Sequence, residues 1–213
     1  MIDDDDDLRE NFLANVKARH AQMTYFATAL MNPAFHWFFT QGQQALQQEL
    51  YIPGVSSLLN GIEASLRVTI AQLDPGYDGD LALSPYQTLS NTLLRKARDL
   101  GVPVQNLAWP GEDDFQQKME TKDNVFIVQL RHDVCHGDIL RFIEMMEYEK
   151  IPILTPESLR STAAELLAVS FAWAHDLAEF RAQHGRRPAG FEIPGLPENP
   201  LAEWLPRRAE AAT

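Results

Sequence analysis

The recurrence of apolar residues at intervals of three and four is the feature that most limits how this chain can fold. This spacing places side chains on one face of an α-helix, whereas a half-buried β-strand has an apolar residue at every second position. The pattern, or the helix start and stop signals that accompany it, covers residues 8–31, 33–50, 55–73, 85–100, 124–148 and 155–184. We therefore predict an all-α fold, a helical bundle of about five to six helices.

The chain has 213 residues, of which 45% are hydrophobic, and this is enough for one well-buried core. We expect a disordered acidic tail at residues 1–7, a single helical-bundle domain at 8–185 and a proline-rich C-terminal extension at 186–213. The extension is too rich in proline for a helix and too apolar to lie in solvent, so we expect it to pack onto its own bundle or onto a partner. Residues 102–123 lack a sustained period and predict a long surface connection.

The charge and the cysteine content limit the partners and the compartment. The net charge is −12, and an acidic chain is a poor general ligand for nucleic acid, because affinity for phosphates comes from cationic groups. RNA binding would therefore need a local basic site, for which the candidates are Arg95, Lys96, Arg98, Lys118, Lys122 and Arg131. With one cysteine and no apolar run long enough for a bilayer, we expect a cytoplasmic protein without a membrane partner.

The stretch VQLRHDVCHGDILRF, residues 128–142, concentrates reactive side chains in the predicted helix 124–148. At 100° per residue this helix is apolar on both sides. One side carries Val125, Val128, His132, Cys135, His136, Ile139 and Ile143, and the other carries Phe126, Ile127, Leu130, Val134 and Met145. One side can face the core and the second needs cover from elsewhere in the chain or from a second subunit. We therefore predict a homodimer that packs through helix 124–148.

Three interpretations of this stretch compete with a phosphate site. His132 and His136 are one turn apart, as in zinc proteases with the pattern H-E-x-x-H, with Glu157 or Glu165 available as a third ligand. However, Asp133 is shorter than the usual glutamate. Cys135 could be a nucleophile with a histidine base, although a lone cysteine on an apolar helix is more often a packing residue. The histidines could also be interior groups with satisfied hydrogen bonds, but so many polar groups in one and a half turns are costly to bury.

The phosphate interpretation uses Arg131 and His136. RNA can be cleaved without a metal when its own 2′-hydroxyl attacks the adjacent phosphate. A histidine can then remove or return a proton, while the planar guanidinium of an arginine holds the phosphate oxygens. A base on one side and an acid on the other are both needed, and a two-fold dimer of helix 124–148 would supply both.

The segment RHDVCHG resembles the R-x-x-x-x-H motif of the HEPN superfamily, and SSLLNGIEASLRVTIAQL resembles the apolar helix with an internal acid that precedes this motif. The resemblance covers about residues 52–180. It implies a helical bundle that dimerises and acts as a metal-independent endoribonuclease, without a cofactor, in toxin–antitoxin or antiviral systems. The alternative is that this chain is a non-catalytic HEPN-like module that binds RNA, a nucleotide or a protein partner.

The resemblance also assigns roles by position. Arg131 would bind the scissile phosphate, His136 would be the general acid or base, and His132 would occupy the polar motif position and support them. An antitoxin or regulatory protein would be a partner. Asp138 stands where the toxins that pair with nucleotidyltransferase antitoxins have a tyrosine, so regulation through that tyrosine is not implied.

Overall fold

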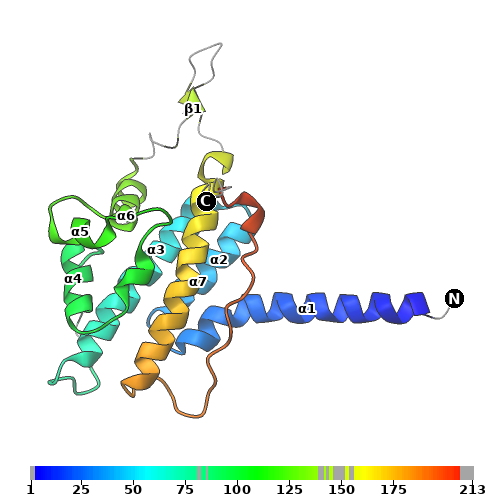
Figure 1. The fold of residues 1–213 in the computed structure, drawn as a ribbon, viewed down its shortest axis with the longest axis horizontal. Helices are drawn as coiled ribbons and strands as arrows, with labels where there is room; N and C mark the ends of the chain where they lie inside the picture. Colours follow the sequence, from blue (N-terminus) through cyan, green and yellow to red (C-terminus); the bar gives the residue numbers. More distant parts are fainter. Residues whose placement is uncertain are drawn as a thin grey trace, which may run out of the picture.

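Seven α-helices make up most of the described part of the chain, in a computed structural model that describes residues 3–80, 83–84, 86–138, 142, 144–145, 152–153 and 156–206 (Figure 1). The α-helices are α1 (Asp3–Leu30), α2 (His36–Gln47), α3 (Tyr51–Leu73), α4 (Asn91–Asp99), α5 (Phe115–Glu120), α6 (Phe126–His136) and α7 (Arg160–Gln183). Short 3-10 helices are η1 (Val104–Leu107), η3 (Pro156–Leu159) and η4 (Ala202–Trp204). The predicted all-α helical bundle is confirmed. None of the described helices combines the length and the apolar character that crossing a bilayer requires.

A small hairpin interrupts the helical order between α6 and α7. Strands β1 (Glu144–Met145) and β2 (Pro152–Ile153) pair in antiparallel fashion, with Glu144 opposite Ile153 and Met145 opposite Pro152. Residues 144 and 145 were expected in the helix 124–148, and their pairing with β2 makes that part of the prediction wrong. Thr155, expected to cap the last helix, lies outside the described residues.

Helix α3 lies at the centre of the bundle, where it packs against α2, α4, α6 and α7. Its apolar stripe is buried as the three- and four-residue spacing predicts. Helices α1, α2 and α7 meet in an aromatic cluster, in which Phe26 stacks on Phe39 at 5.1 Å and on Phe171 at 5.0 Å between ring centroids. On the opposite side of α3, helices α4 and α6 complete the core.

Two segments differ from the sequence-based expectation. Residues 3–7, expected to be a disordered tail, form the first turns of α1. Residues 102–123, expected to be a surface connection, contain η1 and α5 and contribute buried side chains to the core, namely Val104, Leu107, Trp109, Phe115 and Met119. The periodicity of this segment is weak because two short helices and a turn each bury only one or two residues, so no single face repeats.

The proline-rich extension packs along its own bundle as far as residue 206. The side chain of Arg187 is 8% exposed and donates hydrogen bonds to the carbonyls of Thr28 and Ala29, both at 3.1 Å, in the last turn of α1. It also donates to the carbonyls of Phe191 and Glu192 in the extension. The last carbonyls of a helix find no N–H donor within it. Arg187 supplies donors to two of them, so it caps α1 and binds the extension to this helix.

We expect Arg187→Ala to lower the free energy of unfolding by about 3 kcal/mol, because the carbonyls of Thr28 and Ala29 lose a charged donor at the negative end of the helix dipole. Arg187→Lys should give an intermediate loss, since an ammonium keeps the charge but cannot reach four carbonyls in the fork geometry of a guanidinium. Urea unfolding followed by circular dichroism measures both. Equal stabilities of the alanine variant and the wild type would contradict this role.

His36, the first residue of α2, makes folding sensitive to acid. Burial lowers the pKa of its imidazole below the ordinary 6.5, against a smaller opposing effect of the Asn32 backbone. The folded state therefore takes up this proton less readily than the unfolded chain, so stability is lost as the pH falls below 6.5. We expect the free energy of unfolding to fall less between pH 7 and pH 5 in His36→Phe than in the wild type. His20→Gln, at an exposed position in α1, is the control for the loss of an imidazole.

Candidate functional site

Helix α6 carries the motif residues, and two polar side chains from other segments hold its N-terminal end. The backbone N–H of Val125 donates to Asn91 Oδ1 at 3.3 Å, and that of Phe126 donates to Glu112 Oε1 at 2.8 Å. The first N–H groups of a helix lack acceptors within it, and a carboxylate there also meets the positive end of the helix dipole. Sequence reasoning missed Glu112, because this acid lies far from the helix that it caps.

A glycine ends α6 twelve residues before the predicted end at 148. Gly137 adopts the left-handed conformation, with φ of 74°, and the N–H of Asp138 donates to the carbonyl of Asp133 at 2.8 Å. This is the usual way in which a helix stops at a glycine, since a residue with a Cβ would be strained there. His136 is consequently the last residue of the helix, at an exposed end, and not the middle of a long apolar stripe.

The apolar residues of α6 are covered by the chain itself. Val125, Ile127, Val128, Leu130 and Val134 are buried, and Phe126 packs on Trp109 with ring centroids 4.4 Å apart. His132, Cys135 and His136 are exposed, so their assignment to an apolar side was wrong. Ile139 and Ile143 lie outside the described residues. A second subunit is therefore not needed to cover apolar surface on α6, and the original basis for a dimer through this helix does not hold.

Arg131 is positioned by an acid of the preceding central helix. Its Nε lies 3.4 Å from Glu63 Oε2, and the two side chains are only 18% and 12% exposed. Glu63 is itself held, because Oε2 accepts the N–H of Leu89 at 2.7 Å and Oε1 lies 3.7 Å from Arg67 Nη1. No further hydrogen bond or ion pair engages the Arg131 guanidinium within the described residues. Its terminal nitrogens thus keep their capacity to bind an anion, while the ion pair with Glu63 draws the guanidinium toward α3.

His132 and His136 lie side by side on the exposed surface of α6. Their ring centroids are 4.5 Å apart and the rings are inclined by 45°. Neither imidazole is hydrogen-bonded to a residue that the structure describes. The interpretation of these residues as interior histidines with satisfied bonds is therefore wrong, and both rings are accessible to a substrate.

The zinc interpretation does not fit the positions of its ligands. Asp133 is 3% exposed and accepts from Gln129 Nε2 at 2.5 Å, whereas the histidines are exposed. Glu165, a proposed third ligand, accepts from Trp109 Nε1 at 2.6 Å. Among the described residues, the group of three or more potential ligand atoms within 4.8 Å of one another comprises His175, Asp176 and Glu179 on α7. His132 and His136 are not in it.

The remaining candidates from the sequence are distributed over other surfaces or neutralised. Cys135 is exposed, so its interpretation as a packing residue was wrong. Arg98 pairs with Asp99 and Glu120, and Lys118 pairs with Glu112 and Asp114 at 3.2 and 3.0 Å. The expected basic site is thus reduced at α4 and α5 by acidic partners.

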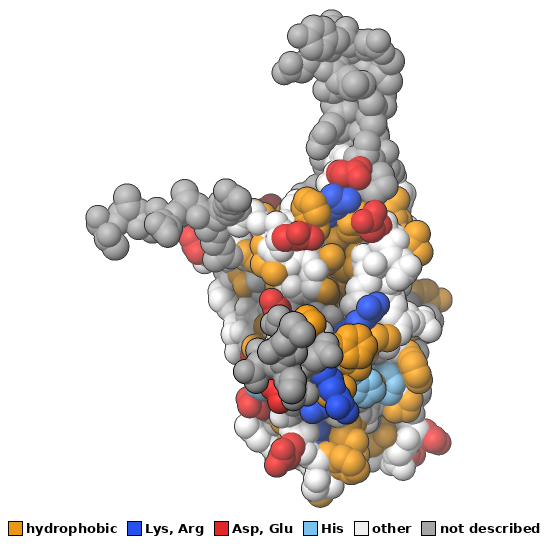
Figure 2. Space-filling model, turned by 90° about the vertical axis from the view of Figure 1, so that its right-hand side faces the viewer, with side chains coloured by type: hydrophobic (Ala, Val, Ile, Leu, Met, Phe, Trp, Pro, Cys, Tyr) orange, Lys and Arg blue, Asp and Glu red, His pale blue; other side chains and the backbone are white. Residues whose placement is uncertain are grey.

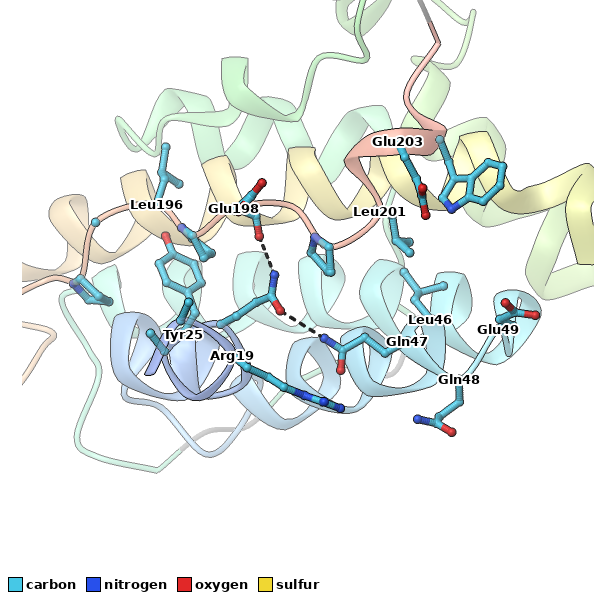
Figure 3. A pocket seen from close by; sticks show the side chains of 18 of the residues that line it. Arg19, Tyr25, Leu46, Gln47, Gln48, Glu49, Leu196, Glu198, Leu201 and Glu203 are labelled. Atoms are coloured by element: carbon cyan, nitrogen blue, oxygen red, sulfur yellow. Dashed lines mark hydrogen bonds between the residues drawn. The ribbon is translucent and has the colours of Figure 1, made fainter. Parts of the chain in front are cut away.

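A cavity of about 710 Å³ lies away from the motif, between α1, α2 and the proline-rich extension (Figure 3). Its wall includes Gln22, whose Nε2 donates to the carbonyl of Glu198 at 2.7 Å, and none of the motif residues lines it. The motif residues therefore lie outside this cavity, with the two exposed histidines and the partly buried Arg131 on α6.

None of the protein-family models, curated proteins or solved structures compared with the chain matches it.

Proposed function

We propose that the chain is a metal-independent endoribonuclease of HEPN type. Arg131 binds the scissile phosphate, His136 transfers the proton as general acid or base, and His132 supports them, without a cofactor. The observation that carries the proposal is the pair of adjacent, exposed imidazoles on the same helix as the Arg131 guanidinium, which pairs with Glu63. A role in a toxin–antitoxin or antiviral system, with an antitoxin or regulatory protein as partner, is part of the proposal through the motif resemblance.

The proposed reaction begins when the 2′-hydroxyl of RNA loses its proton to a base and attacks the adjacent phosphorus. The bond to the 5′-oxygen breaks, and that oxygen receives a proton from an acid, which leaves a 2′,3′-cyclic phosphate and a 5′-hydroxyl. Arginine stabilises the negative charge that accumulates on the phosphate oxygens. Two proton-transfer groups on opposite sides of the phosphate serve this in-line displacement.

A homodimer through α6 would supply the second proton-transfer group and enclose the open site. This dimer is now proposed from the catalytic need for a second histidine and not from apolar surface. The exposed residues at the end of α6 are His132, Cys135 and His136. If both subunits contribute to one site, adding excess His136→Ala protein should reduce the cleavage activity of the wild type by more than the dilution of the wild type accounts for. Activity that falls only with dilution would contradict a shared site.

The test of the function is incubation of the full chain with RNA in EDTA under single-turnover conditions. We expect fragments that end in 2′,3′-cyclic phosphate and begin with a 5′-hydroxyl. Absence of cleavage, or cleavage that appears only after a divalent metal is added, would contradict the proposal.

A non-catalytic module that binds RNA, a nucleotide or a protein through the same surface is the alternative function. The net charge of −12 favours it, because general RNA binding is driven by cationic groups. RNA that is retained on a filter by the protein but remains intact would support this alternative and exclude the enzyme.

A further inference from the structure

The N-terminal part of α1 extends beyond the bundle (Figure 1). Every side chain from Leu8 to Ala21 is exposed, and the first buried residues of the helix are Tyr25 and Phe26. Figure 2 faces the side from which this helix extends, and Lys and Arg side chains gather there beside hydrophobic ones near the middle of the face. Residues 8–17 are therefore a helical segment that no described part of the chain covers, whereas Ala18, Arg19 and Ala21 line the cavity beside the extension.

The exposed segment carries an apolar stripe that continues the buried one. Leu8 and Phe12 are each 66% exposed, Val16 is 48% exposed and Met23 is 39% exposed. At 100° per residue these four fall within a sector of about 80°, on the same side as the buried Phe26 and Leu30. The side of α1 that faces the core near its C-terminal end thus faces solvent over residues 8–21.

A helix of this length is only marginally stable in water when nothing packs against it. Large apolar side chains in one stripe are also a recurrent mark of an interaction surface. Both observations call for a partner that covers this side of α1.

The charges of the segment identify a second copy of the chain as that partner. Residues 3–7 are all aspartate, whereas Lys17 and Arg19 stand at the other end of the exposed segment. Parallel pairing would bring two acidic ends together. Antiparallel pairing centred on Phe12 places Leu8 opposite Val16, and position 5 opposite Arg19. One helix therefore contains both halves of a self-complementary surface, as a two-fold interface requires.

We propose that two copies of the chain associate through antiparallel pairing of α1, with the stripe of Leu8, Phe12, Val16 and Met23 at the interface. Pairing through α1 is independent of any chemistry at α6, which lies on the other side of the bundle (Figure 1).

Sedimentation equilibrium of the full chain tests this association. We expect a mass of at least twice that of one chain. Phe12→Asp should halve this mass, because the loss of a central interface residue raises the dissociation constant at least about 30-fold. Tyr86→Asp is the matched control, since Tyr86 is 91% exposed and lies in the loop between α3 and α4. A monomeric wild type, as expected if another segment, a membrane or another protein covered the stripe, would overturn the proposal. A Phe12→Asp protein with the wild-type mass would also overturn it.

The antiparallel direction has its own tests. Arg19→Glu should weaken the dimer and reduce its sensitivity to salt, whereas Lys96→Glu, on the exposed side of α4, should not. In a Cys135→Ser background, spin labels at position 21 of the two copies should lie about 24 Å further apart along the helix axis than labels at position 11. Similar short distances at both positions would indicate parallel pairing and overturn the proposed arrangement.

Discussion

Replacing His136 with alanine should lower the single-turnover rate of RNA cleavage by roughly 100- to 10,000-fold, the usual contribution of a general acid or base. The side chain is exposed at the end of α6 and has no hydrogen bond to a described residue, so its loss should leave the fold intact. Denaturing gels of end-labelled RNA in EDTA give the rate, and circular dichroism verifies the fold.

Two histidine variants serve as controls for that result. His20→Ala removes another exposed imidazole, in α1, and should retain the wild-type rate. His132→Ala should reduce the rate less than His136→Ala, because His132 is assigned a supporting role beside the ring of His136. Equal rates of cleavage by the wild type and His136→Ala would exclude His136 as the acid or base.

Gly54→Val should lower the free energy of unfolding by about 3 kcal/mol, a loss as large as that expected for Arg187→Ala. Helices α2 and α3 approach closely here, since a Cβ at Gly54 would lie 2.4 Å from Leu46 Cδ2 and 3.2 Å from the carbonyl oxygen of Gly42. The small gain in helix propensity over glycine offsets only a fraction of this overlap. Urea unfolding followed by circular dichroism measures the difference.

Gly195→Val is the matched control for this substitution. A Cβ at Gly195 meets no atom within 4 Å, so the variant should remain within about 0.5 kcal/mol of the wild type. If Gly54→Val were equally stable, α2 and α3 could separate without cost, and their close approach would not be a determinant of the fold.

The parts of the candidate site that local rules govern could be read from the sequence. The motif helix and the acid on α3 follow from residues near each other in the chain. Gly137 is itself a local stop signal, and the prediction of a helix through residue 148 failed because the apolar residues beyond it were given more weight. The pairing of Arg131 with Glu63 could not be predicted, since it joins two helices whose relative rotation depends on packing.

The sequence by itself determined the helical class and the identity of the motif residues, because helix periodicity and glycine stops act within a few residues. Tertiary structure alone decided which apolar side chains are covered. The stripe of α1 is uniform along the sequence, yet Phe26 is buried and Phe12 exposed, because the bundle ends between them. On α6, by contrast, the apolar residues that predicted an interface with a second subunit are buried by other segments of the same chain. Burial depends on which segments meet in space, and that information is non-local.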